Sequence, residues 1–150
     1  MSSEEIIQKE FESLKADLIK AYDAKGMRAS GKWADSLEVI SSPLNGAIMG
    51  LDYSQQLETG RRAGKFPPIK DIEQWIRDKG IIPVDITVKS LAFLIARKIA
   101  REGWKRENNG GVELISEVVT DERMQSIIDK VGEVVIFEFS TDIIKAIKQI

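Results

Sequence analysis

Histidine and cysteine are both absent from this chain of 150 residues. Without cysteine there is no disulfide framework and no thiolate nucleophile. Without histidine, Ser-His and Cys-His catalytic systems are excluded, and so are zinc sites with Cys or His ligands. Enzymes that use carboxylates, lysine or tyrosine alone stay open. The composition therefore lowers the expectation of catalysis, and we expect no enzyme activity, no cofactor and no metal.

Long apolar runs are also absent. No run reaches the roughly 18 residues that a membrane-spanning helix needs. The first ten residues, MSSEEIIQKE, are polar and acidic, unlike a secretory signal. With 43% hydrophobic and 31% charged residues, the composition is typical of a soluble globular protein. We therefore expect a single globular domain over residues 1–150, with no membrane partner.

The charges are unevenly distributed along the chain. Residues 61–106 contain 12 Lys/Arg and 5 Asp/Glu, a net charge of +7, whereas the remainder contains 10 and 19, a net charge of −9. A basic middle between acidic ends indicates faces of opposite sign. Such faces suit head-to-tail docking between copies or contact with an anionic partner.

A long N-terminal helix is the first predicted element. Ser2 and Glu5 have the spacing of a capping box, and Lys25-Gly26 is a stop signal. Between these signals runs one apolar stripe with helical spacing, formed by Ile7, Phe11, Leu14, Leu18 and Tyr22.

A β-hairpin is predicted next. The chain after the first helix is loop-like up to the stretch LEVIS, which has the composition of a strand. The Asn45-Gly46 pair between two apolar runs is the strongest hairpin signal in the sequence. We predict antiparallel strands at about residues 36–42 and 46–52.

Two more helices are predicted in the basic middle of the chain. Pro67-Pro68 opens the first, and Gly80 caps it. Thr87 caps the second, which should run from Val88 to about Arg106. Their apolar faces are Ile69, Ile72, Trp75 and Ile76 in the first, and Val88, Leu91, Ile95 and Ile99 in the second. Phe93 and Leu94 lie off the second stripe, which predicts that this helix is buried on more than one side.

The C-terminal part admits two interpretations. Glu107–Gly111, with the sequence ENNGG, is a clear break. The later stretch EVVIFEF is rich in β-formers, but helical spacing continues past it through Met124, Ile128, Val131, Val135, Phe139, Ile143, Ala146 and Ile150. We favour a long C-terminal helix. The predicted fold class is α+β, mostly helical, with a small antiparallel β-hairpin sheet packed against long N-terminal, central and C-terminal helices.

A positively charged elbow lies between the hairpin and the proline pair. Tyr53–Thr59 is predicted to be a short helix or turn that ends at Gly60, and Arg61, Arg62 and Lys65 follow. The segment GRRAGK lacks the spacing and the Ser/Thr of a phosphate-binding loop, so a solvated basic turn is the more ordinary interpretation. Glu58 beside the arginines is better explained by an ion pair, worth about 0–1 kcal/mol, than by acid–base catalysis.

A basic stripe lies on the second of these helices. It comprises Arg97, Lys98, Arg101 and Lys105, with Trp104 beside them. Basic residues near an aromatic side chain are typical of nucleic-acid binding, although such a stripe is more often the solvated face of an amphipathic helix. The three tryptophans, Trp33, Trp75 and Trp104, are better explained as packing or interface residues than as stacking platforms for bases.

Two short motifs resemble head–tail joining proteins of tailed phages, also called neck or tail-completion proteins. One is Ser30-Gly31-Lys32-Trp33 with Ser36, leading into a strand. The other follows the hairpin and consists of Tyr53, Leu57, Glu58 and Gly60. The continuation of the chain resembles a variant from phages of gut Bacteroidetes. The resemblance covers roughly residues 1–106, and it departs from the commoner pattern in a helix-forming insertion at Ile69–Lys79.

The resemblance implies a structural virion protein that does no chemistry. It would be made in the bacterial cytoplasm and would form a ring at the head–tail interface of the virion. The ring would lie between portal and tail, with genome DNA passing through its lumen and touching it transiently and non-specifically. The isolated chain would be monomeric or weakly associated. We expect Arg61, Arg62 and Lys65 to meet acidic residues of the adjacent copy, with Phe66, Glu58 and Trp33 also at the interface.

Two other function classes stay open. A nucleic-acid-binding module would use the basic helix face 97–106, with Arg97, Lys98, Arg101 and Lys105 facing DNA. A small enzyme that works with carboxylates ranks last, because His, Cys and a recognisable phosphate loop are all absent from the sequence.

Overall fold

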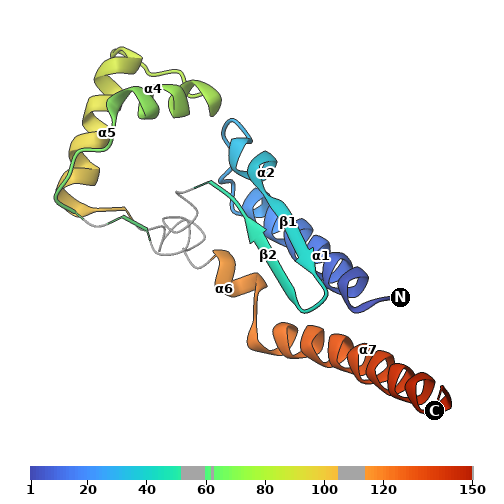
Figure 1. Ribbon diagram of the computed structural model, residues 1–150. Helices are drawn as coiled ribbons and strands as arrows, with labels where there is room; N and C mark the ends of the chain where they lie inside the picture. The colour runs from blue at the N-terminus through green and yellow to red at the C-terminus, as the bar shows by residue number, and fades with distance from the viewer. Residues whose placement is uncertain (52–59, 62, 105–113, 150) are drawn as a thin grey trace.

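The computed structural model describes residues 1–51, 60–61, 63–104 and 114–149 (Figure 1). These residues are mostly helical and include one two-stranded antiparallel sheet. The elements are α1 (Ser3–Ala24), α2 (Lys32–Ser36), β1 (Glu38–Ser42), β2 (Asn45–Met49), α4 (Ile69–Asp78), α5 (Val88–Glu102), α6 (Leu114–Val118) and α7 (Asp121–Lys148). The predicted mostly helical α+β class is confirmed. The predictions for Tyr53–Thr59 and for the break at Glu107–Gly111 lie outside the described residues.

The α1 helix begins and ends as the sequence predicts. The Ser2 hydroxyl accepts a hydrogen bond from the backbone N–H of Glu5, and the Glu5 carboxylate accepts one from the backbone N–H of Ser2. Gly26 follows the helix with a φ of 65°, a value that favours glycine. The predicted stripe is the buried side of α1 at four of its five positions, and Phe11 is half-buried.

The hairpin packs against α1, but its turn is not where the sequence placed it. Ser42 pairs with Asn45, so the two-residue turn is Pro43-Leu44, and both strands are shorter than predicted. The Asn45-Gly46 pair therefore indicated the hairpin correctly, but it does not form the turn, because both residues lie in β2.

Gly46 is explained by close packing. A Cβ atom at this position would lie 2.6 Å from Ile7 Cγ2 and 3.0 Å from two ring carbons of Phe11. A glycine in a strand often marks such a close approach of two backbones. Gly46 thus lets β2 lie directly on α1.

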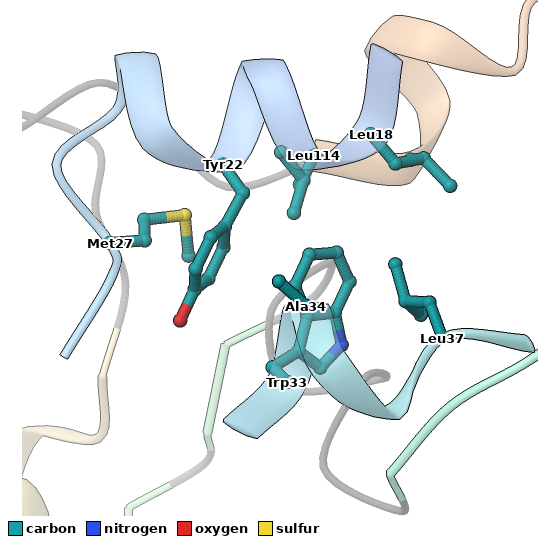
Figure 2. Close-up of a cluster of buried hydrophobic side chains, with 7 residues drawn as sticks. All are labelled: Leu18, Tyr22, Met27, Trp33, Ala34, Leu37 and Leu114. Atoms are coloured by element: carbon teal, nitrogen blue, oxygen red, sulfur yellow. The ribbon is translucent and has the colours of Figure 1, made fainter. Parts of the chain in front are cut away.

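The α2 helix is a short turn that sequence reasoning missed. It follows Gly31, whose φ is 82°. The turn directs Trp33 into the main hydrophobic cluster, where its ring centroid lies 4.6 Å from that of Tyr22 (Figure 2). The cluster consists of Leu18, Tyr22, Met27, Trp33, Ala34, Leu37 and Leu114, and it therefore joins α1, α2 and α6.

A second, separate cluster holds α4 and α5 together. Its buried members are Ile72, Ile76, Ala92 and Ala96, and Ile69 and the whole predicted stripe of α5 pack against them. Trp75 of the predicted α4 face is instead 41% exposed, so its assignment to that face is wrong for the single chain. The start of α4 after Pro68, its end before Gly80 and the Thr87 cap of α5 agree with the sequence analysis.

Two details of α5 differ from the prediction. The helix ends at Glu102, four residues earlier than expected, because Gly103 adopts a φ of 74°. Phe93 and Leu94 are 45% and 41% exposed, so burial of α5 on more than one side is wrong for the single chain.

The C-terminal residues form the predicted long helix, α7, with Gly132 inside it. Its first half meets α1 through ion pairs from Arg123 to Asp17 (2.5 Å) and from Lys130 to Glu10 (2.8 Å), and Ile127 between them is buried. In Figure 1, the end of α7 and the α4–α5 unit lie at opposite ends of the molecule. No helix among the described residues has the length and apolar character needed to cross a bilayer.

Candidate interaction surface

The basic elbow runs alongside the C-terminal half of α5 in the antiparallel direction. The backbone N–H of Arg61 donates to the carbonyl of Trp104 (2.8 Å), and the N–H of Trp104 donates back to the carbonyl of Arg61 (2.7 Å). Further along, the N–H of Gly64 donates to the carbonyl of Ala100 (2.7 Å). Three backbone hydrogen bonds therefore fasten the elbow to the helix end.

Packing and backbone geometry brace the same segment. The Phe66 ring stacks on that of Phe93, with 6.1 Å between centroids. Pro67 is buried, and the buried Gly60 has a φ of 77°. A braced segment loses little conformational entropy when a partner docks on it.

The pairing brings together two groups of cations that are separate in the sequence. Lys65 from the elbow and Arg97, Lys98 and Arg101 from α5 are all exposed, while Arg61 is half-buried. None of the ion pairs formed between described residues involves these five side chains. We call this set of five the cationic ridge.

The remaining predicted site residues have other positions. Glu58, Arg62 and Lys105 lie outside the described residues. Phe66 is 53% exposed, so half of its surface is free for a partner even though its ring stacks on Phe93. Trp33 is only 2% exposed and contributes to the core, so in the single chain its indole offers no contact surface.

Sequence reasoning missed the contact that creates the ridge. The Arg61–Trp104 bridge joins two segments on either side of the α4–α5 unit, and no local pattern encodes it. The available signals were Gly103, which ends α5 early, and Gly60, which precedes the bridge. Both have positive φ and mark sharp changes of chain direction.

Among the described residues, the pKa values that shift belong to Glu5, in the first turn of α1, and to Arg28, shortly after its end, and both are far from the ridge in sequence. A hydrogen bond from the backbone N–H of Ser2 lowers the pKa of Glu5. The hydrogen bond and ion pair with Asp23 raise the pKa of Arg28. Both interactions lie at the ends of α1, and both are structural.

A hollow of ≈ 620 Å³ lies along α7, but one helix supplies all of its walls, from Asp121 to Glu133. A surface built from a single helix does not enclose a ligand as binding clefts do. In the part of the chain that the structure describes, there is no group of three or more acidic side chains placed to hold a metal ion. The cationic ridge is therefore the best-defined candidate site, and its chemistry suits binding of anionic groups.

Comparisons of this chain with protein-family models, with curated proteins and with solved structures found no match.

Proposed function

We propose that this protein is a structural subunit of a tailed-phage particle that acts without chemistry, as the sequence motifs imply. Copies would form a ring at the head–tail interface, next to the portal or to other neck and tail proteins. The observation that carries this proposal is the elbow, which three backbone hydrogen bonds fasten to α5 and which presents cations that have no acidic partner among the described residues.

The architecture supports a binding role. The guanidinium and ammonium groups of the ridge are positively charged hydrogen-bond donors, which complement carboxylates on a neighbouring protein or phosphates on DNA. The ends of the chain carry a net charge of −9, so an adjacent copy offers carboxylates in excess. A heterologous contact between such unlike surfaces generates a closed ring when the rotation between subunits closes.

The proposal is tested with particles whose genome encodes a charge reversal in the ridge. Arg61→Glu with Lys65→Glu should reduce the amount of this chain in purified particles, because the reversed charges repel the acidic surface of the neighbour. The matched control is Lys9→Glu with Lys20→Glu, which makes the same charge change at exposed positions of α1. Quantitative mass spectrometry measures incorporation, and electron microscopy locates the chain.

Two results would refute this proposal at different levels. If particles with wild-type protein do not contain the chain, it is not a virion component. If the ridge variant enters particles as well as the control does, the chain can still be a virion protein, but the ridge is not its contact.

The second candidate is a nucleic-acid-binding module, favoured by the exposed positions of Arg97, Lys98 and Arg101. Binding to duplex DNA would then weaken steeply with salt, with a slope of about −0.9 in log K against log salt for each neutralised phosphate. Replacing Arg97 by alanine should reduce this slope by about 1. Weak binding with a shallow slope would favour the structural role.

A further inference from the structure

The second half of α7 carries an exposed apolar face. Its members are Ile136, Phe137, Phe139, Ile143, Ile144 and Ile147, whose side chains are between 43% and 72% exposed. We call them the distal face. An apolar group of this kind on a single helix marks an interaction site when it is not buried within the chain.

The geometry of α7 prevents α1 from covering this face. Arg123 and Lys130 of α7 pair with α1, and the buried Ile127 lies between them on the same side of the helix. Ile127 precedes Ile136 by nine residues. At about 100° per residue, these two side chains lie on opposite sides of the helix. Lys145 is 18 residues after Ile127 and therefore returns to the side that meets α1. Before residue 136, α7 turns an apolar side chain toward α1, and from residue 136 onward its apolar side chains lie on the opposite side of the helix. The distal face is therefore directed away from α1.

A second apolar patch lies in the connection between α4 and α5. Its members are Ile81, Ile82, Val84 and Ile86, and the exposed fractions of Ile82 and Val84 reach 87% and 81%. Such exposure is high for aliphatic side chains gathered in six residues. We call these four residues the loop patch. The loop patch and the distal face belong to elements at opposite ends of the molecule (Figure 1).

The total exposed surface matches a subunit with two neighbours. The chain exposes 10458 Å², which is about 2,800 Å² more than a compact monomer of 16.8 kDa should expose. A standard interface buries about 800 Å² on each partner. The excess is therefore large enough for two such contacts on every copy, one at each end.

The charges around the two patches are complementary. The α7 helix carries six Asp/Glu and four Lys/Arg, whereas the described residues from 61 to 104 carry five Asp/Glu and nine Lys/Arg. Two α7 helices facing each other would bring like net charges together. Contact between α7 of one copy and the α4–α5 unit of another brings opposite charges together.

We propose that the distal face of one copy binds the loop patch of a second copy of this chain. The contact is heterologous, because two different surfaces meet, and each copy uses both surfaces once. This inference deepens the proposed function, on which it rests for the ring, by naming two apolar surfaces that join adjacent subunits in addition to the cationic ridge.

The test uses purified full-length protein and two complementary variants. The first variant, Ile136→Gln with Ile143→Gln, changes the distal face, and the second, Ile82→Gln with Val84→Gln, changes the loop patch. All four side chains are exposed, and circular dichroism verifies that both variants fold. A control, Thr141→Gln with Lys145→Gln, changes two polar residues in the same part of α7. Thr141 is half-buried and Lys145 is exposed.

Sedimentation equilibrium at high protein concentration then distinguishes the possible contacts. Wild type and control should form species larger than a dimer. Each variant alone should stay monomeric, since every contact needs one intact surface of each kind. An equimolar mixture should approach twice the mass of one chain and go no further, because only one productive contact remains in each pair.

Disulfide cross-linking captures weak association. It is specific to the introduced cysteines, because the chain has no cysteine of its own. A Val84→Cys chain mixed with an Ile147→Cys chain should form the mixed disulfide in excess over both homodimers. Monomers throughout, with no excess of mixed disulfide, overturn the inference. A loop-patch variant that associates as wild type does also overturns it, because the loop patch is then not part of the contact. Neither result depends on whether particles contain the protein, so this failure is separable from failure of the proposed function.

Discussion

The backbones of Arg61 and Trp104 exchange two hydrogen bonds, with N···O distances of 2.8 and 2.7 Å, although the whole α4–α5 unit lies between them in the sequence. The bridge joins the segment that precedes α4 to the segment that follows α5. The two ends of the α4–α5 unit are therefore held together by backbone hydrogen bonds. The position of the cations on the elbow therefore depends on the geometry of α5 and not on the local sequence alone.

Substitution of Gly64 should loosen the elbow without changing its charge. Gly64 has a φ of 125°, where an L-residue is strained by about 1–3 kcal/mol, although a Cβ would meet no atom within 4 Å. We expect Gly64→Ala to speed hydrogen exchange at the amides of Arg61, Gly64 and Trp104, while the amides inside α4 and α5 keep their protection. The measurement is hydrogen–deuterium exchange resolved by residue.

Lys65→Ala is the matched control for this experiment, since it removes an exposed cation next to Gly64 and leaves the backbone free to keep its conformation. It should exchange like wild type. Equal protection in Gly64→Ala and wild type would show that the three hydrogen bonds do not hold the elbow.

Truncation of Trp33 should destabilise the chain strongly. Its side chain is 2% exposed and fills the main cluster beside Tyr22, Leu18 and Leu114, which come from two other helices. Trp33→Ala should lower the free energy of unfolding by about 3–5 kcal/mol, because the cavity it leaves adds to the lost apolar burial. Urea denaturation followed by circular dichroism measures this change.

The corresponding truncation at Trp75 is the control for Trp33. That side chain is 41% exposed on α4, so Trp75→Ala should lower the free energy of unfolding by much less. If both variants lost the same stability, the assignment of Trp33 to the core would be incorrect.

Patterns that repeat along the chain predicted the long helices well. The stripe on α1 and the continuous spacing in α7 depend on local geometry that every turn repeats, and they outweighed the β-rich stretch near Phe139. The Thr87 cap and the Gly80 stop are likewise local, because they satisfy backbone groups within one turn. These elements could therefore be predicted from local sequence alone, without knowledge of the elements they pack against.

Features that depend on contacts between residues far apart in the sequence could not be predicted. The five residues of α2 are too few to reveal a helical period, and the burial of Trp33 depends on α1 and α6. Gly46 resembled a turn signal, but a glycine is needed at this position because the side chains of Ile7 and Phe11 lie against it. The cationic ridge likewise requires the Arg61–Trp104 bridge, which no residue spacing in the sequence predicts.

The position of Gly46 leads to a direct test of its role. Gly46→Ala should lower the free energy of unfolding by about 1–3 kcal/mol, because the added methyl group would lie 2.6 Å from Ile7 Cγ2. Gly132→Ala should instead raise it by about 0.5–1 kcal/mol, since Gly132 lies inside α7 with no atom within 4 Å of the added carbon. Thermal unfolding of the two variants and of wild type shows whether each substitution lowers or raises the stability. A neutral effect at Gly46 would mean that β2 can move away from α1 at no cost.

The capping box of α1 should make stability depend on pH through Glu5. The hydrogen bond from the Ser2 N–H lowers the pKa of Glu5 below its ordinary value of 4.5 in the folded chain. A group whose pKa is lowered by folding stabilises the protein fully above its unfolded pKa, and this contribution is lost as the pH falls through the lower folded value. Wild type should therefore be more stable than Glu5→Ala at neutral pH, and the difference should shrink progressively as the pH falls below 4.5.

Urea denaturation of both proteins across this pH range measures the difference. Glu4→Ala provides the control, because Glu4 lies in the same first turn of α1 without a part in the capping box. Its stability difference from wild type should vary less with pH than that of Glu5→Ala. A Glu5→Ala difference that stayed constant from neutral to acid pH would indicate that the carboxylate does not cap the helix, because only an ionised group accepts this hydrogen bond with full strength.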